Sequence, residues 1–141
     1  IGCGKGFLLY EIKKILKNIK LVGLDISSYA IRKSKKEVKK YLKTHDINYG
    51  LKKFNTNSFD LIFSINTLHN IKLKNIPFCL KEIERVGKEK FICVESYKNE
   101  KQQFNLQCWA LTAETIIGVD DWKWLFLENG YTGEYEFIFF N

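Results

Sequence analysis

Residues 1–6 read IGCGKG, with glycine at positions 2, 4 and 6, and an amphipathic stretch follows directly on this turn. Because glycine has no Cβ, such a turn lets the backbone approach a ligand closely, and the next helix presents its N-terminus to that ligand. Asp25 stands about 20 residues further on, at the end of the apolar run 20–26. A glycine turn, a helix and a strand that ends in an acid are the parts of a nucleoside-binding α/β unit.

The spacing of the glycines separates the possible ligands. A dinucleotide fingerprint, GxGxxG, would need glycine where the chain has Phe7, and the phosphate loop GxxxxGK[ST] fails because Lys5 is followed by Gly6. The carboxylate of Asp25 can instead accept hydrogen bonds from the two hydroxyls of a ribose. The pattern therefore predicts a nucleoside ligand without phosphates and disfavours a nicotinamide-dependent dehydrogenase.

Hydrophobic periodicity predicts alternating helices and strands. We expect four helices: residues 7–18, a helix capped by Ser27-Ser28 that runs through residue 42, residues 76–86 and residues 120–128. We expect strands over residues 20–26, 59–65, 91–94 and 133–140. Residues 45–53 are a weaker stretch, and residues 97–113 have no clean period. The alternation predicts a doubly wound α/β fold with a mostly parallel sheet. Because Ile1 opens directly on the glycine turn, we expect the first strand to be missing or incomplete.

Length and composition predict one globular domain, residues 1–141. The net charge of +7 comes from lysines spread along helical stretches, which fits solvated helix faces better than an anionic partner. The four cysteines show no CxxC spacing, so we expect buried small hydrophobes and no metal. No apolar run approaches the roughly 20 residues that span a bilayer. A cytoplasmic protein without membrane contact is the prediction.

Four stretches resemble successive motifs of class I S-adenosylmethionine-dependent methyltransferases: IGCGKGFLLYE, LVGLDIS, NSFDLIFSINTLHNI and LKEIERVGKEKFICVESY. The resemblance covers the chain to about Tyr97. It implies a Rossmann-like methyltransferase fold and S-adenosylmethionine as cofactor, with a cofactor-binding part of about residues 1–97 and an acceptor-side part of about residues 98–141. The third-strand region departs from the family pattern, and Asp46 and Asn48 are both possible equivalents of the adenine-contacting residue.

The resemblance also assigns cofactor-binding roles to single residues. The glycine turn would contact the methionine moiety through Gly2, Gly4 and Gly6, with Cys3 between them. Asp25 would bind the ribose hydroxyls, Ile26 would flank the adenine, and Asn66, after the strand over residues 59–65, would lie beside the cofactor.

Methyl transfer depends mainly on alignment of donor and acceptor, and a general base is needed only for acceptors that lose a proton early. The catalytic candidates are His69, in the turn NTLHN, and Glu95, at the end of the strand over residues 91–94, because ligands of open α/β sheets bind at the carboxyl ends of strands. Each also has an ordinary structural role to weigh against catalysis, namely packing against the next helix for His69 and rim packing for Glu95. Helical spacing places Trp122 in the core, and the place of Trp109 stays open.

The predicted function is transfer of a methyl group from S-adenosylmethionine to a small-molecule or sugar-type acceptor. One alternative is a non-catalytic or degenerate methyltransferase-like binding module. Another is a nucleic-acid methyltransferase, which is disfavoured but not excluded because residues 64–67 read SINT where amino-group DNA methyltransferases carry [DNS]PP[YFW]. The reacting atom and the oligomeric state are not readable from the sequence.

Overall fold

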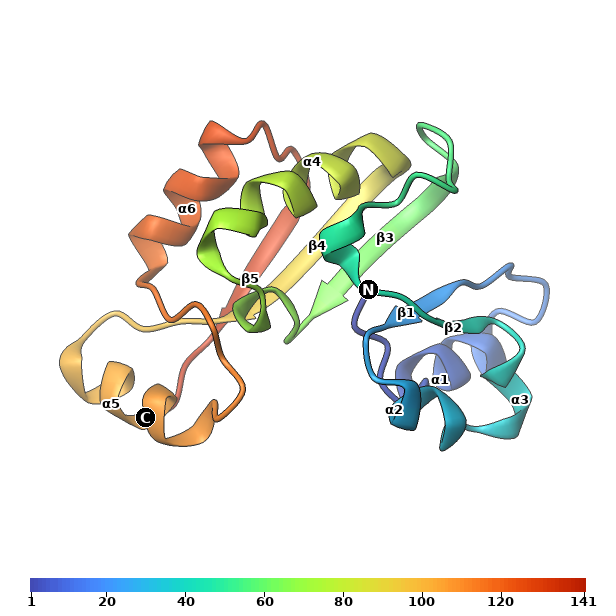
Figure 1. The fold of residues 1–141 in the computed structure, drawn as a ribbon, viewed down its shortest axis with the longest axis horizontal. Helices are drawn as coiled ribbons and strands as arrows, with labels where there is room; N and C mark the ends of the chain where they lie inside the picture. The colour runs from blue at the N-terminus through green and yellow to red at the C-terminus, as the bar shows by residue number, and fades with distance from the viewer. The chain divides into compact units, whose positions relative to one another are not determined.

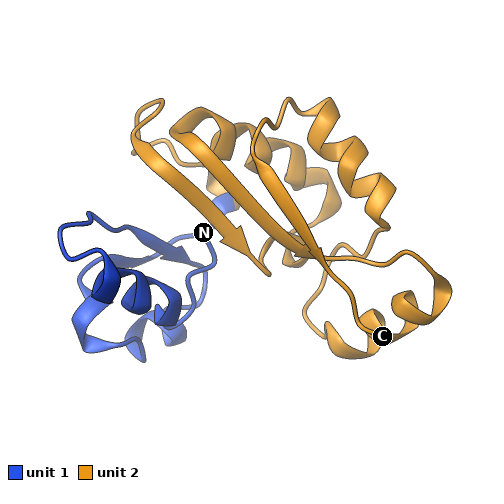
Figure 2. Cartoon of the chain, turned by 180° about the vertical axis from the view of Figure 1, so that it is seen from behind, with its two compact units in different colours: residues 1–47 blue, residues 48–141 orange.

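The glycine turn and the predicted second strand lie in the first of two compact units of the computed structural model, which describes residues 1–141 (Figure 2). This unit covers residues 1–47 and contains the helices α1 (Phe7–Ile15), α2 (Ser28–Arg32) and α3 (Lys36–Lys39) and the strands β1 (Gly23–Asp25) and β2 (Leu42–Thr44). The two strands form a parallel sheet in which Gly23 pairs with Leu42 and Asp25 with Thr44. Parallel pairing places the ends of both strands, and hence Asp25, at one edge of the sheet.

The helix predicted through residue 42 is wrong in its second half. Ser27 caps α2 as expected, since its hydroxyl accepts a hydrogen bond from the Ala30 N–H at 3.1 Å. The helix ends at Arg32, a short α3 follows, and Leu42 begins β2. The spacing of Val38 and Leu42 suits a helix, but Leu42 is buried by pairing beside Gly23, so packing against the sheet overrides the local pattern.

The second unit, residues 48–141, is built on a parallel sheet with the strand order β3 (Phe59–Ile65), β4 (Gly87–Glu95), β5 (Glu134–Ile138). Its helices are α4 (Ile76–Val86), α5 (Glu100–Trp109) and α6 (Val119–Glu128), with the short 3₁₀ turns η2 (Leu68–Asn70) and η3 (Leu73–Asn75). A further turn, η1 (Ile47–Tyr49), lies where the two units meet in sequence. Figures 1 and 2 show α4 and α6 together on one face of this sheet.

The core of the second unit lies between this sheet and the helices α4 and α6. Helix α4 buries Ile76, Cys79, Leu80, Ile83 and Val86, which is one face at helical spacing. Each large side chain of this kind contributes roughly 1.5–3 kcal/mol when fully buried. The observed bounds of β3 and α4 agree with the predicted ranges 59–65 and 76–86, and Pro77 lies in the first turn of α4.

Helix α6 confirms two further expectations. Trp122 is completely buried and stacks on Phe126 with ring centroids 5.8 Å apart, so it belongs to the core. The helix stops at Asn129-Gly130, where Gly130 has a φ of 65° and the Tyr131 N–H donates to the Phe126 carbonyl at 2.9 Å. This left-handed residue ends the helix where the predicted range 120–128 ends.

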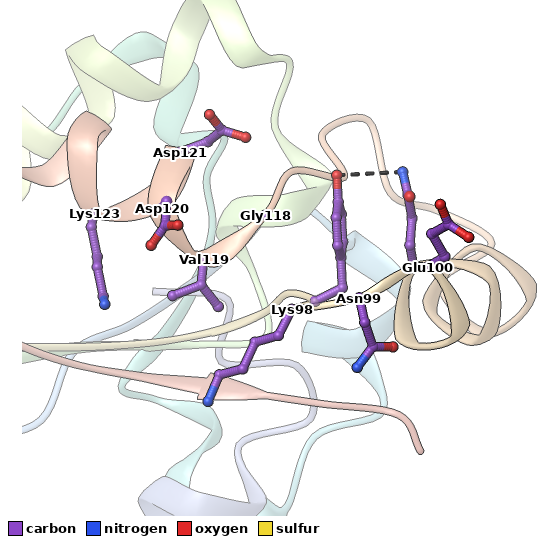
Figure 3. A pocket seen from close by; sticks show the side chains of 10 residues that line it. Lys98, Asn99, Glu100, Gly118, Val119, Asp120, Asp121 and Lys123 are labelled. Carbon is purple, nitrogen blue, oxygen red and sulfur yellow. Dashed lines mark hydrogen bonds between the residues drawn. The ribbon is translucent and has the colours of Figure 1, made fainter.

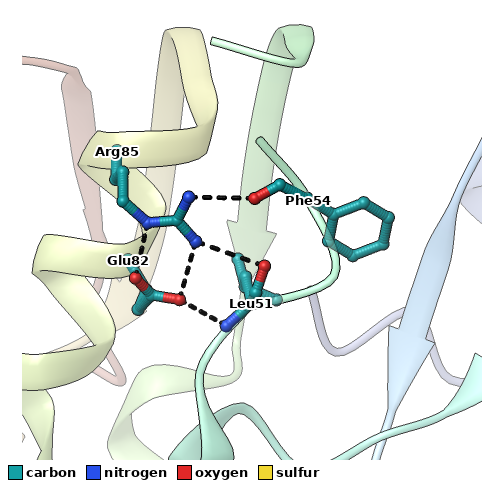
Figure 4. Close-up of polar contacts among 4 residues, drawn as sticks. All are labelled: Leu51, Phe54, Glu82 and Arg85. Carbon is teal, nitrogen blue, oxygen red and sulfur yellow. Dashed lines mark hydrogen bonds and ion pairs between the residues drawn. The ribbon is translucent and has the colours of Figure 1, made fainter. Parts of the chain in front are cut away.

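A polar clamp ties the loop before β3 to α4 (Figure 4). Arg85 donates to the carbonyl oxygens of Phe54 at 2.9 Å and Leu51 at 3.2 Å, and its Nε donates to Glu82 Oε1 at 2.7 Å. Glu82 in turn accepts the Leu51 N–H. The hydrogen bond from Arg85 lowers the pKa of Glu82. The clamp holds residues 51–54, next to the region where the sequence departs from the pattern of the family it resembles.

The cysteines are only partly as predicted. Cys79 is buried, Cys3 and Cys93 are half-buried and Cys108 is exposed, and all four are free thiols. Cys108 lies on α5, a helix that the sequence did not predict. No helix of the chain is both long enough and apolar enough to cross a membrane.

Candidate functional site

The glycine turn is held in shape by its own backbone and by β1. The Cys3 N–H donates to the Leu24 carbonyl at 3.0 Å, and the Gly6 N–H closes the turn on the Cys3 carbonyl at 2.9 Å. Gly2, Gly4 and Gly6 have φ values of 69°, 53° and 75°, in the left-handed region that residues with a Cβ avoid. The turn leads directly into α1, whose first N–H groups face out of the helix end.

The glycines of the turn serve different purposes. A Cβ added to Gly4 would meet no atom within 4 Å, so the space in front of this residue is open. A Cβ added to Gly6 would lie 2.8 Å from Leu42 Cδ1 and 3.0 Å from Val38 Cγ2, because the helix packs closely on the sheet there. Gly4 is therefore the position where a ligand has room to approach the backbone, and Gly6 is needed for packing.

Asp25 fastens the turn to the end of β1. Its Oδ2 accepts the Gly4 N–H at 2.7 Å, and its Oδ1 accepts the Ser27 N–H at 2.8 Å. A carboxylate has about four acceptor sites, so each oxygen of this half-buried side chain can still accept one hydrogen bond from a ligand. Ile26 follows with 68% of its surface exposed, and its side chain is available as an apolar contact for a flat ring.

Cys3 is not a reactive thiol in this setting. Burial and the neighbouring Asp25 raise its pKa to about 11, so the thiol stays protonated at neutral pH. Its Sγ lies 3.8 Å from the Gly4 carbonyl oxygen. Cys3 therefore contributes a small polarisable side chain to the turn and no nucleophile.

In the second unit, Asn66 is strained at the carboxyl end of β3. It has a φ of 51°, and its N–H donates to the Cys93 carbonyl at 2.9 Å. Asparagine tolerates the left-handed region better than most residues, and such strain is frequent at ligand sites. The predicted role of Asn66 beside a cofactor stays a prediction.

The two catalytic candidates, His69 and Glu95, are brought together at this edge of the second sheet. His69 Nε2 lies 3.3 Å from Glu95 Oε2, and the side chains are 8% and 7% exposed. Burial lowers the pKa of His69 and raises the pKa of Glu95, so each group favours its neutral form. His69 Nδ1 and Glu95 Oε2 are both buried without a hydrogen-bond partner, so the 3.3 Å contact is not a hydrogen bond, and such unpaired atoms are costly in a pair with a structural role alone.

The backbone around His69 is fixed by the segment before α6. The His69 carbonyl accepts the N–H groups of Glu114 at 2.9 Å and Thr115 at 3.0 Å, and Thr115 Oγ1 donates to the Ile71 carbonyl at 2.7 Å. The imidazole is thus anchored by its main chain, and the predicted packing role and the predicted proton-accepting role do not exclude each other.

A cavity that the sequence did not predict follows the end of β4 (Figure 3). It has a volume of about 560 Å³ and lies among the first turns of α5 and α6 and the segment after Glu95. Tyr97 lines it, whereas Trp109, whose place the sequence left open, does not. The one available signal was Asn99, whose side chain caps α5 by accepting the Gln102 N–H at 3.0 Å.

Parallel strands, helices between them and a glycine turn fastened to an acid at a strand end define a Rossmann-like α/β fold. The family model described as "Methyltransferase domain" matches residues 1–130, and the chain belongs to this family. Among solved structures, the fold is similar to a SAM dependent methyltransferase from Archaeoglobus fulgidus, with a TM-score of 0.70 and 19% sequence identity. That match covers 92% of this chain and 57% of the other, so the chain spans a little over half of that protein's length. A comparison with curated proteins finds no match.

Proposed function

We propose that the protein binds S-adenosylmethionine and transfers its methyl group to a small-molecule or sugar-type acceptor, and that residues 1–141 form one methyltransferase domain. The observation that carries the proposal is the open space in front of Gly4, which has a backbone conformation suited to glycine. Asp25 holds this residue at the end of β1 by accepting its N–H. A loop of this shape fits a nucleoside that has an amino-acid tail and no phosphates, and the family membership supports the same cofactor.

The residues of the turn would hold the cofactor. The backbone of Gly2, Cys3 and Gly4 offers a surface without side chains to the methionine moiety, and Asp25 has acceptor sites for the ribose hydroxyls. Ile26 offers an apolar contact for the adenine. When bound, S-adenosylmethionine supplies a methyl group whose bond to sulfur breaks with the electron pair left on sulfur.

His69 would take the proton of a hydroxyl acceptor. Its lowered pKa leaves the imidazole neutral at pH 7, and one ring nitrogen of a neutral imidazole carries a free lone pair that can accept a proton. Glu95, whose Oε2 lies 3.3 Å from His69 Nε2, would in its ionised form stabilise the imidazolium that forms. Both roles are part of the proposal.

The test is calorimetric titration of S-adenosylhomocysteine into the protein, with NAD as the control ligand. Gly4→Ala is the informative variant, because its methyl group would enter the open space before the turn. Gly130→Ala is a matched control, since Gly130 also has a positive φ, 65°, and no atom within 4 Å of an added Cβ. Both variants carry a similar backbone strain of roughly 1–2 kcal/mol, so they differ only in where the methyl group lies.

We expect micromolar binding of S-adenosylhomocysteine by the wild type and by Gly130→Ala, and at least tenfold weaker binding by Gly4→Ala. Equal affinity in all three proteins would refute the cofactor role of the glycine turn. A protein with a native circular dichroism spectrum that binds NAD and not S-adenosylhomocysteine would refute the proposal as a whole. Binding without transfer to any acceptor would favour the non-catalytic module.

A further inference from the structure

The cavity after β4 has two walls of different origin. Lys98, Asn99 and Glu100 come from the segment that starts α5, and Val119 and Asp120 come from the first turn of α6 (Figure 3). The walls are joined by the backbone, since the Val119 N–H donates to the Tyr97 carbonyl at 3.2 Å. Because β4 is the central strand of its sheet, the cavity begins at the edge where open α/β sheets bind their ligands.

The charged side chains that line the cavity are three carboxylates and two lysines, and no ion pair joins them. Glu100, Asp120 and Asp121 are exposed carboxylates, and none of them takes part in an ion pair. Of the two lysines, Lys98 places its ammonium over the Phe139 ring, 4.6 Å from the centroid. The acids are therefore left as hydrogen-bond acceptors toward the cavity.

The uncharged part of the lining consists of one aromatic ring, two amides, one glycine and one valine. Gln103 Nε2 donates to the Tyr97 hydroxyl at 3.3 Å and so holds the ring in place. Gly118 faces the edge of this ring, because an added Cβ would lie 3.6 Å from Tyr97 Cε2. Only Val119 adds an aliphatic side chain to the ten residues of the lining.

This lining selects against two classes of ligand. Three carboxylates against two lysines repel a polyphosphate backbone, and a single valine beside one ring offers little to a purely apolar molecule. Acceptors and donors placed around an aromatic ring suit a molecule with many hydroxyl groups, which donates to carboxylates and accepts from lysine and amide groups.

We infer that this cavity of the second unit binds a neutral polyhydroxylated small molecule of the size of one or two sugar rings. Asp120 binds vicinal hydroxyls, and the Tyr97 ring packs on the face of the sugar. The cavity volume of about 560 Å³ lies within the range of small-ligand sites.

Saturation-transfer NMR on the protein tests the site with methyl α-D-glucopyranoside as the probe and cyclohexanol as the control of similar ring size with one hydroxyl. Asp120→Asn removes the charge and keeps the shape, and Glu128→Gln in the same helix is its control, because Glu128 lies outside the cavity. Gly118→Ala fills part of the cavity without strain, since its φ is −71°. S-adenosylhomocysteine is titrated into each sample to report the cofactor site separately.

We expect saturation of the glucoside and not of cyclohexanol, with about tenfold weaker binding in Asp120→Asn and Gly118→Ala and no change in Glu128→Gln. A protein that binds S-adenosylhomocysteine and saturates neither probe overturns this site and leaves the proposed function standing. Saturation that is equal in all variants also overturns it, because the glucoside then binds elsewhere. Saturation of cyclohexanol alone assigns the cavity to apolar ligands and contradicts the inference.

Discussion

Replacement of Asp25 tests the glycine turn most directly, because one side chain is expected to affect both folding and binding. In Asp25→Ala the N–H groups of Gly4 and Ser27 lose acceptors at 2.7 Å and 2.8 Å. A hydrogen bond to a charged group contributes roughly 1.5–3 kcal/mol, and water can reach this half-buried position and replace part of each bond. We therefore expect a loss of about 2–3 kcal/mol in the free energy of unfolding.

Urea unfolding followed by circular dichroism measures this loss. With an m-value of about 2 kcal/mol per molar, the midpoint should fall by about 1 M. Asp25→Asn keeps one acceptor oxygen and should fall between the wild type and Asp25→Ala. Asp25→Asn should also bind S-adenosylhomocysteine at least tenfold more weakly, because an amide has fewer acceptor sites for two hydroxyls.

Two results would contradict this reasoning at different steps. An unchanged urea midpoint in Asp25→Ala would mean that the carboxylate does not hold the turn. A lowered midpoint with unchanged affinity for S-adenosylhomocysteine would retain the structural role of Asp25 and refute its role at the ribose.

Three further substitutions probe other parts of the chain. Burial raises the pKa of Glu95, so ionisation of this carboxyl reduces the stability of the wild type as the pH rises above about 4.5 and through the raised pKa. Glu95→Gln should therefore have a higher melting temperature than the wild type at pH 8, and the difference should be much smaller at pH 4. An equal difference at both pH values would contradict this. Glu84→Ala should lower the free energy of unfolding by about 3 kcal/mol, because the Lys90 side chain is only 8% exposed and its ammonium would lose its partner at 2.8 Å. Asp60→Ala is the control: it breaks the exposed ion pair with Lys88 and should leave the urea midpoint unchanged. Gly6→Ala should lower the melting temperature more than Gly4→Ala, because only at Gly6 does the new methyl group meet Leu42 and Val38; equal shifts would refute the packing role.

Two elements, β3 and α4, were predicted with the bounds that the structure has, whereas the helix predicted over residues 7–18 ends at Ile15 and the strand predicted over residues 20–26 covers only residues 23–25. The run FDLIFSI forms β3, and the stripe of Ile76, Leu80 and Ile83 forms the buried face of α4. In both, local preference and burial act in the same direction, so the sequence pattern alone identifies the element.

The helix α5 could not be predicted from periodicity because it has no buried face. Leu106 is its one buried residue, and Phe104 and Trp109 are 65% and 67% exposed. Its one signal in the sequence is the Asn99 cap, and its place is fixed by contacts with the end of the chain, where Asn105 Nδ2 donates to the Phe140 carbonyl at 3.2 Å. One wall of the cavity lies on α5, so the sequence could not predict the cavity without predicting this helix.

The catalytic candidates show how far a topological rule reaches. The rule that ligands bind at the carboxyl ends of strands selected His69 and Glu95 separately, one after β3 and one at the end of β4. Their contact at 3.3 Å follows from β3 and β4 being neighbours in one sheet, and the strand order is not written in the local sequence of either segment. The sequence identified the residues, and the sheet order made them a pair.

The glycine turn makes the same point at the scale of single atoms. Gly4 and Gly6 have the same sequence context, two residues apart, and both have a positive φ. What separates them is the presence of Leu42 across from Gly6 and open space across from Gly4, and Leu42 belongs to a strand that the sequence had placed in a helix. A motif therefore marks where a ligand can bind, whereas the residue that faces the ligand is decided by packing from distant segments of the chain.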